Sequence, residues 1–170
     1  DDRTLLKEQF PKLERAILFF DSYIRKFKLL PPMPEYWVFF DWAPLYRQGY
    51  SAVFNLMYLG ALQCMVEICR ILGKDKGFYQ KQAELVEKRI IKYFWDEHDK
   101  VFYDGVDMET HGLIKKISQH THALTILTGL QPEFHRKFCE EILIPPMKKP
   151  ALTDANIIEA SPYFYFYVIE

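Results

Sequence analysis

The stretch SAVFNLMYLGALQCMVEICRILG, residues 51–73, decides the fold of this chain. Its spacing predicts a helix that begins after Ser51, which can cap an N-terminus, and ends at Gly73, which favours a C-terminus. Apolar residues cover nearly the whole circumference, and the polar ones share a narrow stripe: Gln63, Glu67 and Arg70. Because a helix with this pattern is surrounded by protein, we predict that residues 51–73 are buried.

The helices predicted on either side alternate in character. The first, third and fifth are amphipathic, whereas the second, fourth and sixth are predicted to be buried. In chain order their ranges are Thr4–Lys28, Ser51–Gly73, Asp75–Trp95, Ser118–Thr128, 132–144 and Ser161–Ile169. We expect Pro145, Pro146 and Pro150 to close the fifth helix, and the alternating Tyr and Phe of the sixth would also suit a strand. Val101–Tyr103 is predicted to be a strand of a small hairpin.

This alternation predicts an all-α fold with two concentric layers. The amphipathic helices form the outer ring, the buried helices form the inner ring, and each successive pair is an αα-hairpin. About three hairpins fit into the chain, and a closed ring needs more residues than this.

The composition excludes several classes of protein. Hydrophobic residues make up 49% and aromatic residues 16%, with a formal net charge of -1, so the chain is globular and not disordered. It contains no basic tract that would indicate nucleic-acid binding. The longest apolar stretch, Leu56–Leu72, is interrupted by polar and charged residues, so we expect no membrane span.

In a ring of alternating helices, the loops that lead into the inner helices lie at one end. Three such loops carry polar or aromatic groups: Phe40-Asp41-Trp42, Ser118-Gln119-His120, and Ile158-Glu159 ahead of Ser161. A carboxylate beside an indole suits a sugar, because the acid accepts hydrogen bonds from hydroxyls while the ring covers an apolar sugar face. We therefore predict a carbohydrate site with Asp41, Trp42 and His120.

Each of these loops also has an interpretation without a ligand. Asp41 would cap a turn, and Trp42 would pack in the core. Ser118 would be only a helix N-cap, with His120 facing solvent. Glu159 would be a loop carboxylate favoured by the positive end of the next helix.

No cofactor and no metal are expected from the motifs. The sequence has no glycine-rich phosphate loop, no nucleophile elbow and no H-E-x-x-H. His120 and His122 stand two apart, so on a helix they point in different directions and cannot share an ion.

Several short segments resemble the catalytic domain of α-L-rhamnosidases, glycoside hydrolase family 78. The first are Trp37-Val38-Phe39-Phe40-Asp41-Trp42 and Gly49-Tyr50, followed by Asn55, Tyr58 and Ala61-Leu62. The later ones are Ile71-Leu72-Gly73, Tyr93-Phe94-Trp95-Asp96, Phe102-Tyr103-Asp104, Ser118-Gln119-His120, Ala123-Leu124, Gly129-Leu130 and Ser161-Pro162-Tyr163-Phe164. Each segment is a weak signal alone, but their order and spacing cover nearly the whole chain.

The resemblance implies that residues 1–170 are a fragment of an (α/α)6 toroid that hydrolyses terminal α-L-rhamnosides with inversion. Inversion uses a protonated acid and a carboxylate base about 6.5–9.5 Å apart. In the family, the acid lies in a motif of cysteine, proline, arginine and acidic residues well before the Asp-Trp pair, and that motif does not occur here. The base glutamate precedes the next inner helix, past Glu170. Both catalytic carboxylates are thus expected outside the segment, while Trp42 corresponds to the family's substrate-contacting tryptophan.

Membership of this fold does not fix the sugar, because six-hairpin toroids also serve other glycosidases and sugar epimerases. The alternative function, from another class, is a non-catalytic α/α toroid that binds a ligand or a partner. A partial ring has open edges. We therefore expect apolar surface near both termini, covered by a homodimer partner, by crystal neighbours or by further chain.

Overall fold

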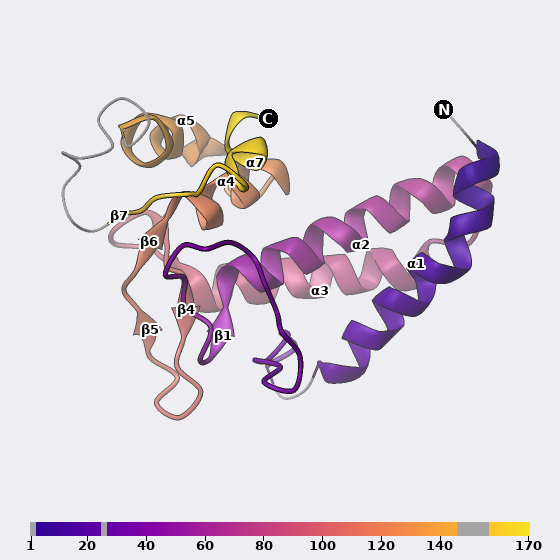
Figure 1. Cartoon of the computed structure of the whole chain (residues 1–170), viewed down its shortest axis with the longest axis horizontal. Helices are drawn as coiled ribbons and strands as arrows, with labels where there is room; N and C mark the ends of the chain where they lie inside the picture. The colour runs from indigo at the N-terminus through magenta and orange to yellow at the C-terminus, as the bar shows by residue number, and fades with distance from the viewer. Residues whose placement is uncertain (1–2, 25–26, 146–156) are drawn as a thin grey trace.

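The fold of the chain is seen in a computed structural model, which describes residues 3–24, 27–145 and 157–170. Two long helices, α2 (Ala52–Leu72) and α3 (Gly77–Phe94), lie side by side, and α1 (Arg3–Tyr23) packs on α2 (Figure 1). The shorter helices α4 (Gln119–Leu127), α5 (His135–Phe138) and α7 (Tyr165–Ile169) gather beside them. Because α2 contacts α1, α3 and α4, it lies between these three helices. Helix α4 also contacts α7.

Helix α2 has the bounds that the sequence predicts. The Ser51 side chain accepts a hydrogen bond from the Phe54 amide, and Gly73 adopts the left-handed conformation with φ 67°. The amide of Lys74 then donates to the Cys69 carbonyl at 2.9 Å, which satisfies a carbonyl at the helix end. The two caps fix where the central helix starts and stops.

The predicted alternation of burial is confirmed for the first four helices, but α7, which was predicted to be buried, has no buried side chain. Nine side chains of α2 and seven of the nine in α4 are buried, whereas α1 buries only two, Phe10 and Ile17. Helix α3 buries a single face, formed by Tyr79, Ala83, Val86, Ile90 and Phe94. The amphipathic helices therefore cover the apolar ones.

Some helix boundaries differ from the prediction. Helix α1 ends at Tyr23 and not at Lys28, and the fifth helix is composite: a 3-10 turn (Pro132–Phe134), α5, and a π-helix (Cys139–Leu143). The last segment is helical and not a strand, but it is shorter than predicted. Pro146 and Pro150, which we expected to end the fifth helix, lie outside the described residues.

The all-α prediction needs one correction, because the described loops also contain seven strands of two residues each. Antiparallel β1 (Tyr50–Ser51), β4 (Gly105–Val106) and β5 (Leu113–Ile114) form one sheet. Strands β2 (Trp95–Asp96) and β3 (Val101–Phe102) form the predicted hairpin, and β6 (Ile117–Ser118) pairs in parallel with β7 (Ile157–Ile158). Backbone groups of buried loops need hydrogen-bond partners, and these short pairings supply them.

Helix α2 is also the one described helix that is long and apolar enough to cross a membrane. Half of its most apolar window is buried inside the fold, and it contacts α1, α3 and α4. The core helix of a soluble protein passes the same test, so its length and composition are weak evidence for a span.

Apolar surface lies near both termini, as expected for a partial ring. Large apolar side chains are exposed on α1 and in and before α7: Leu5, Leu18, Phe19, Tyr163, Phe166 and Ile169. Such faces pack against further protein when it is present.

A buried asparagine fastens the long loop between α1 and β1 to the central helix. The Asn55 side chain accepts a hydrogen bond from the Leu30 amide at 2.7 Å and donates to the Leu30 carbonyl at 3.2 Å. It also donates to the Ser51 carbonyl at 2.9 Å, and both Asn55 and Leu30 are fully buried. One amide side chain therefore satisfies three backbone groups.

We expect Asn55→Ala to lower the free energy of unfolding by about 2–4 kcal/mol, because it leaves the buried amide and carbonyl of Leu30 without partners. Chemical denaturation measures this change. The control is Gln80→Ala, which removes only an exposed hydrogen bond to Glu84. Equal stability of the two variants would contradict the role of Asn55.

Candidate functional site

The side chain of Asp41 is completely buried and joins three separate segments of the chain. Its Oδ2 lies 2.6 Å from His120 Nε2 in the first turn of α4 and accepts from the Ser161 amide at 2.8 Å. Its Oδ1 accepts from the Trp42 amide at 2.8 Å and from the Ser161 hydroxyl. Four donors thus surround two oxygens, and neither Asp41 nor His120 exposes any side-chain surface.

These hydrogen bonds set the charge of the pair. Burial, the largest influence, raises the pKa of Asp41, but the bonds from Ser161, His120 and Trp42 together lower it below its usual range. Burial lowers the pKa of His120 below its usual value, although the neighbouring Asp41 acts in the opposite direction. An ionised Asp41 therefore accepts from the Nε2–H of a neutral His120.

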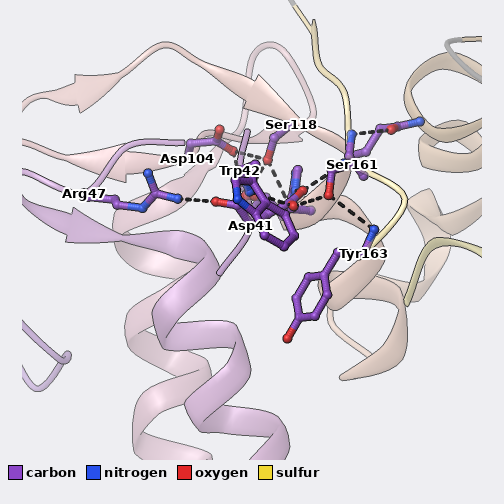
Figure 2. A network of polar contacts seen from close by, with 11 residues as sticks. Asp41, Trp42, Arg47, Asp104, Ser118, Ser161 and Tyr163 are labelled. Carbon is purple, nitrogen blue, oxygen red and sulfur yellow. Dashed lines mark hydrogen bonds and ion pairs between the residues drawn. The ribbon is translucent and has the colours of Figure 1, made fainter. Parts of the chain in front are cut away.

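Beside this buried pair, Trp42 is largely exposed. Its indole is 73% accessible and contacts Phe39 and Tyr163, with ring centroids 4.8 and 5.5 Å away. Phe39 also contacts Tyr163 and the exposed Trp37, at 5.7 and 5.4 Å. We call these four residues the aromatic cluster. Figure 2 shows Trp42 and Tyr163 beside the network that holds Asp41.

The three loops that were predicted to lie together do meet in the structure. The Gln119 side chain donates to the Leu143 carbonyl at 2.8 Å and accepts from the Ala160 amide at 2.8 Å. Together with the bonds of Asp41, this joins the loop after α1, the start of α4 and the segment before α7. Arg47 adds a bond from Nη2 to the Asp41 carbonyl at 2.6 Å (Figure 2).

A second buried polar group lies under the start of α4. Asp104 accepts from the hydroxyls of Ser118 and Thr121 at 2.8 and 2.6 Å, on one oxygen, and burial raises its pKa to about 6 against these bonds. His122 Nδ1 lies 2.9 Å from the Ser118 carbonyl, while its Nε2 accepts from the Phe102 amide at 3.3 Å. Burial lowers the pKa of His122 to about 4, so the folded protein keeps this histidine neutral.

The structure brings Asp41, Trp42 and His120 together, as the sequence predicts, but in different environments. Only Trp42 can be reached by a ligand, so the interpretation of Trp42 as a core residue does not fit. His120 does not face solvent, and Asp41 does more than cap a local turn. Every lone-pair direction of the Asp41 carboxylate is already used, which leaves it no capacity for a sugar hydroxyl. Glu159 is half-buried.

Two residues that hold this site lie in the candidate loops but were not predicted as site residues. Ser161 donates twice to Asp41 from a position 120 residues away, and Gln119 joins α4 to two other segments. The available signal was the run of five polar residues that opens α4, Ser118–His122, in a helix predicted to be buried. Buried polar side chains need partners, so such a run indicates a hydrogen-bonded network.

Within the described residues, one group of side chains could surround a cation: Asp96, His98 and Asp99. An Asp96 oxygen, however, already accepts from the amides of His98 and Asp99 at 2.9 and 2.8 Å, and Asp99 accepts from the Tyr103 hydroxyl. The hydrogen bonds of a tight turn between β2 and β3 account for this group without an ion.

Comparison with known proteins places this geometry in context. Residues 1–149 match the family described as the bacterial alpha-L-rhamnosidase 6 hairpin glycosidase domain. A family GH78 rhamnosidase from Bacillus sp. GL1 has a similar structure, with a TM-score of 0.83 at 20% identity over 99% of this chain. A rhamnosidase from Klebsiella oxytoca with rhamnose bound gives a TM-score of 0.70 at 18% identity over 95%. No curated protein sequence matches significantly.

The chain spans only part of these relatives, 17% of the Bacillus chain and 29% of the Klebsiella chain. At such identities the likeness of structure shows the fold, and it agrees with the helical arrangement described above.

The two buried titratable groups predict how stability depends on pH. Between about pH 4 and 6, Asp104 is ionised in the unfolded chain but retains its proton in the folded one, so its contribution to stability falls as pH rises. His122 has the opposite effect on stability. Between about pH 4 and 6.5, the unfolded chain binds a proton on this histidine and the folded chain does not, so the contribution of His122 to stability rises with pH.

We expect Asp104→Asn to remove the fall in stability that Asp104 causes as pH rises, because asparagine does not titrate. The substitution keeps an oxygen that can accept from Ser118 and Thr121. Relative to the wild type, the variant should then gain on the order of 2 kcal/mol as pH rises from 4 to 6, the equivalent of about one and a half pKa units. Urea denaturation at several pH values measures this difference. The exposed variant Asp75→Asn is the control, and parallel curves for Asp104→Asn and the wild type would refute the assignment.

Proposed function

Because the chain belongs to the bacterial α-L-rhamnosidase six-hairpin glycosidase domain family, we propose that it forms part of an enzyme that hydrolyses terminal α-L-rhamnosides. In this proposal α2, α4 and α7 belong to the inner ring of an (α/α)6 toroid, and their leading loops form one side of the sugar pocket. The observation that carries the proposal is an exposed indole, Trp42, next to a carboxylate that is buried and fully hydrogen-bonded.

Trp42 is the residue of this chain that contacts the sugar. Pyranose rings have apolar faces, and an indole that is exposed but held by its neighbours offers such a face a flat surface. Phe39 and Tyr163 meet the Trp42 ring at steep angles, 73° and 89°, and Trp42 nevertheless remains 73% exposed. The exposed position of the ring supports this role.

Asp41 and His120 position Trp42 and do not touch the sugar themselves. Asp41 accepts from the Trp42 amide, which fixes the backbone that carries the indole. It also binds Ser161, two residues before Tyr163, so one carboxylate orients both sides of the Trp42–Tyr163 contact. His120 occupies another Asp41 lone pair and packs against Phe164, with ring centroids 4.3 Å apart.

The reaction proceeds with inversion of the anomeric carbon. A protonated carboxyl group gives its proton to the leaving oxygen while a carboxylate base activates a water on the opposite face. A base must present a free oxygen to that water, and Asp41, the carboxylate beside Trp42, has none. Asp41 is therefore not the base, and in this proposal the acid and the base come from other parts of the enzyme, as the resemblance to the family implies.

We expect the 170-residue chain on its own to show no turnover of nitrophenyl α-L-rhamnoside, since an inverting reaction without an acid and a base has no proton donor and no activated water. A colorimetric assay of the purified chain, beside a complete family GH78 rhamnosidase as the positive control, measures this. Turnover by the chain alone would overturn the expectation and direct attention to Glu159, the other carboxylate of these loops.

In the complete domain, we expect Trp42→Ala to lower kcat/KM by roughly 30- to 150-fold, because the lost apolar contact is worth about 2–3 kcal/mol. Its melting temperature should stay near that of the wild type, as the indole is exposed. The control is Phe78→Ala, which removes another exposed aromatic ring at the start of α3.

A core role for Trp42 makes the opposite prediction. The variant would then lose about 3–5 kcal/mol of stability and keep a normal kcat/KM in its folded fraction. Thermal melting together with steady-state kinetics separates the two roles.

A further inference from the structure

Asp104 is a buried carboxylate that the proposed function does not use, and its backbone is fixed at two points. The residue lies between β3 and β4. Its amide donates to the Lys116 carbonyl at 2.8 Å, and its carbonyl accepts from the Ala52 amide at 2.9 Å. These bonds tie Asp104 to the segment before α4 and to the first residue of α2. Its side chain, only 1% exposed, is therefore held in a defined place.

The carboxylate of Asp104 holds the first turn of α4. Its Oδ1 accepts from the Ser118 hydroxyl at 2.8 Å and from the Thr121 hydroxyl at 2.6 Å. Ser118 is the N-cap of this helix, and its hydroxyl oxygen accepts from the Thr121 amide at 3.2 Å. Residues three apart lie on the same side of a helix, so both hydroxyls reach Asp104 from one face of the turn. The two bonds therefore oppose both a shift and a rotation of the helix start.

The same turn carries His120, which connects it to the loop of Trp42. His120 follows Ser118 by two residues, and its Nε2 lies 2.6 Å from Asp41 Oδ2. Asp41 Oδ1 in turn accepts from the Trp42 amide at 2.8 Å. Figure 2 shows Asp104 and Ser118 beside Asp41 and Trp42. A shift of the turn would draw His120 away from Asp41 and loosen the backbone that carries the indole.

Stability alone does not account for a carboxylate at this position. Asp104 Oδ2 is buried and accepts no hydrogen bond from the residues that the structure describes. Burial raises the pKa of Asp104 to about 6, so the folded protein disfavours the charge. A buried polar group that costs stability can still specify one arrangement of its neighbours. Asp104 has this effect on the two hydroxyls that it binds.

We propose that Asp104 is a positioning residue for the rhamnose contact: it holds the first turn of α4, and His120 and Asp41 transmit that position to Trp42. Asp104 does not touch the sugar, because its side chain is buried. The inference rests on the proposed function, which supplies the rhamnose contact. Loss of the Asp104 hydrogen bonds then weakens catalysis only through Trp42.

Thr121→Val tests this role in the complete domain, because it removes one hydroxyl bond to Asp104 and nearly keeps the shape of the side chain. We expect kcat/KM for nitrophenyl α-L-rhamnoside, per folded protein, to fall about threefold to tenfold, the factor that corresponds to one hydrogen bond. The matched control is Thr125→Val, the same substitution one turn later, where the hydroxyl donates to the Thr121 carbonyl at 2.8 Å. This control should keep the wild-type value.

Two substitutions of Asp104 itself separate the loss of its hydrogen bonds from other effects. Asp104→Leu removes both bonds and should lower kcat/KM by about tenfold or more. Asp104→Asn keeps an oxygen that can accept from both hydroxyls, so it should recover most of this loss. An Asn variant as slow as the Leu variant would contradict the role of the hydrogen bonds. If Asp104→Leu does not fold, Thr121→Val decides alone.

A double-mutant cycle with Trp42→Ala shows whether Asp104 acts through Trp42. In that case Thr121→Val should have no further effect on kcat/KM in a Trp42→Ala background. Two factors that multiply, or a Thr121→Val variant with the wild-type kcat/KM, would refute the positioning role and leave the rhamnose contact intact. If Trp42→Ala itself leaves kcat/KM unchanged, the proposed rhamnose contact is wrong, and the positioning role is wrong with it.

Discussion

The ionised carboxylate of Asp41 lies out of contact with water, and a charge in that position is tolerable only when hydrogen bonds replace its hydration. The donors come from the next residue, from the first turn of α4 and from the segment before α7. If any of these segments moved away, a lone pair of a buried anion would be left without a partner. This penalty keeps three loops in one arrangement, and the presentation of Trp42 depends on it.

The molecule thus separates the residues that fix the geometry from those that are exposed around Trp42. Polar side chains are buried beneath the surface, in the Asp41 and Asp104 groups, whereas aromatic rings occupy the surface above them. Apolar burial around α2 gives most of the folding free energy but is not directional. The buried hydrogen bonds fix how the segments are oriented relative to one another, because each requires its partner at a set distance and angle.

The features that were predictable from the sequence are those with a local signal. Ser51 and Gly73 mark the ends of α2 through cap preferences, and periodic apolar residues separate buried helices from amphipathic ones. Strands of two residues have no period to detect, and the composite fifth helix carries no composition that distinguishes it from an α-helix. The presence of Asp41, Trp42 and His120 in one site followed from the order of helices, but their contacts did not. Asp41 is hydrogen-bonded to Ser161, which lies 120 residues later in the sequence, and is therefore not available to a sugar. No local sequence pattern predicts a contact over such a separation.

The span of these hydrogen bonds has a consequence for the order in which the protein is made. His120 follows Asp41 by 79 residues and Ser161 by 120, so during synthesis the aspartate leaves the ribosome long before its partners. The α2–α3 hairpin is local in sequence and can form early, whereas closing such long loops is slow and entropically costly. Until Ser161 has been added, Asp41 remains hydrated and the Trp42 loop has no fixed position. The surface around Trp42 is therefore among the last parts of this chain to take shape.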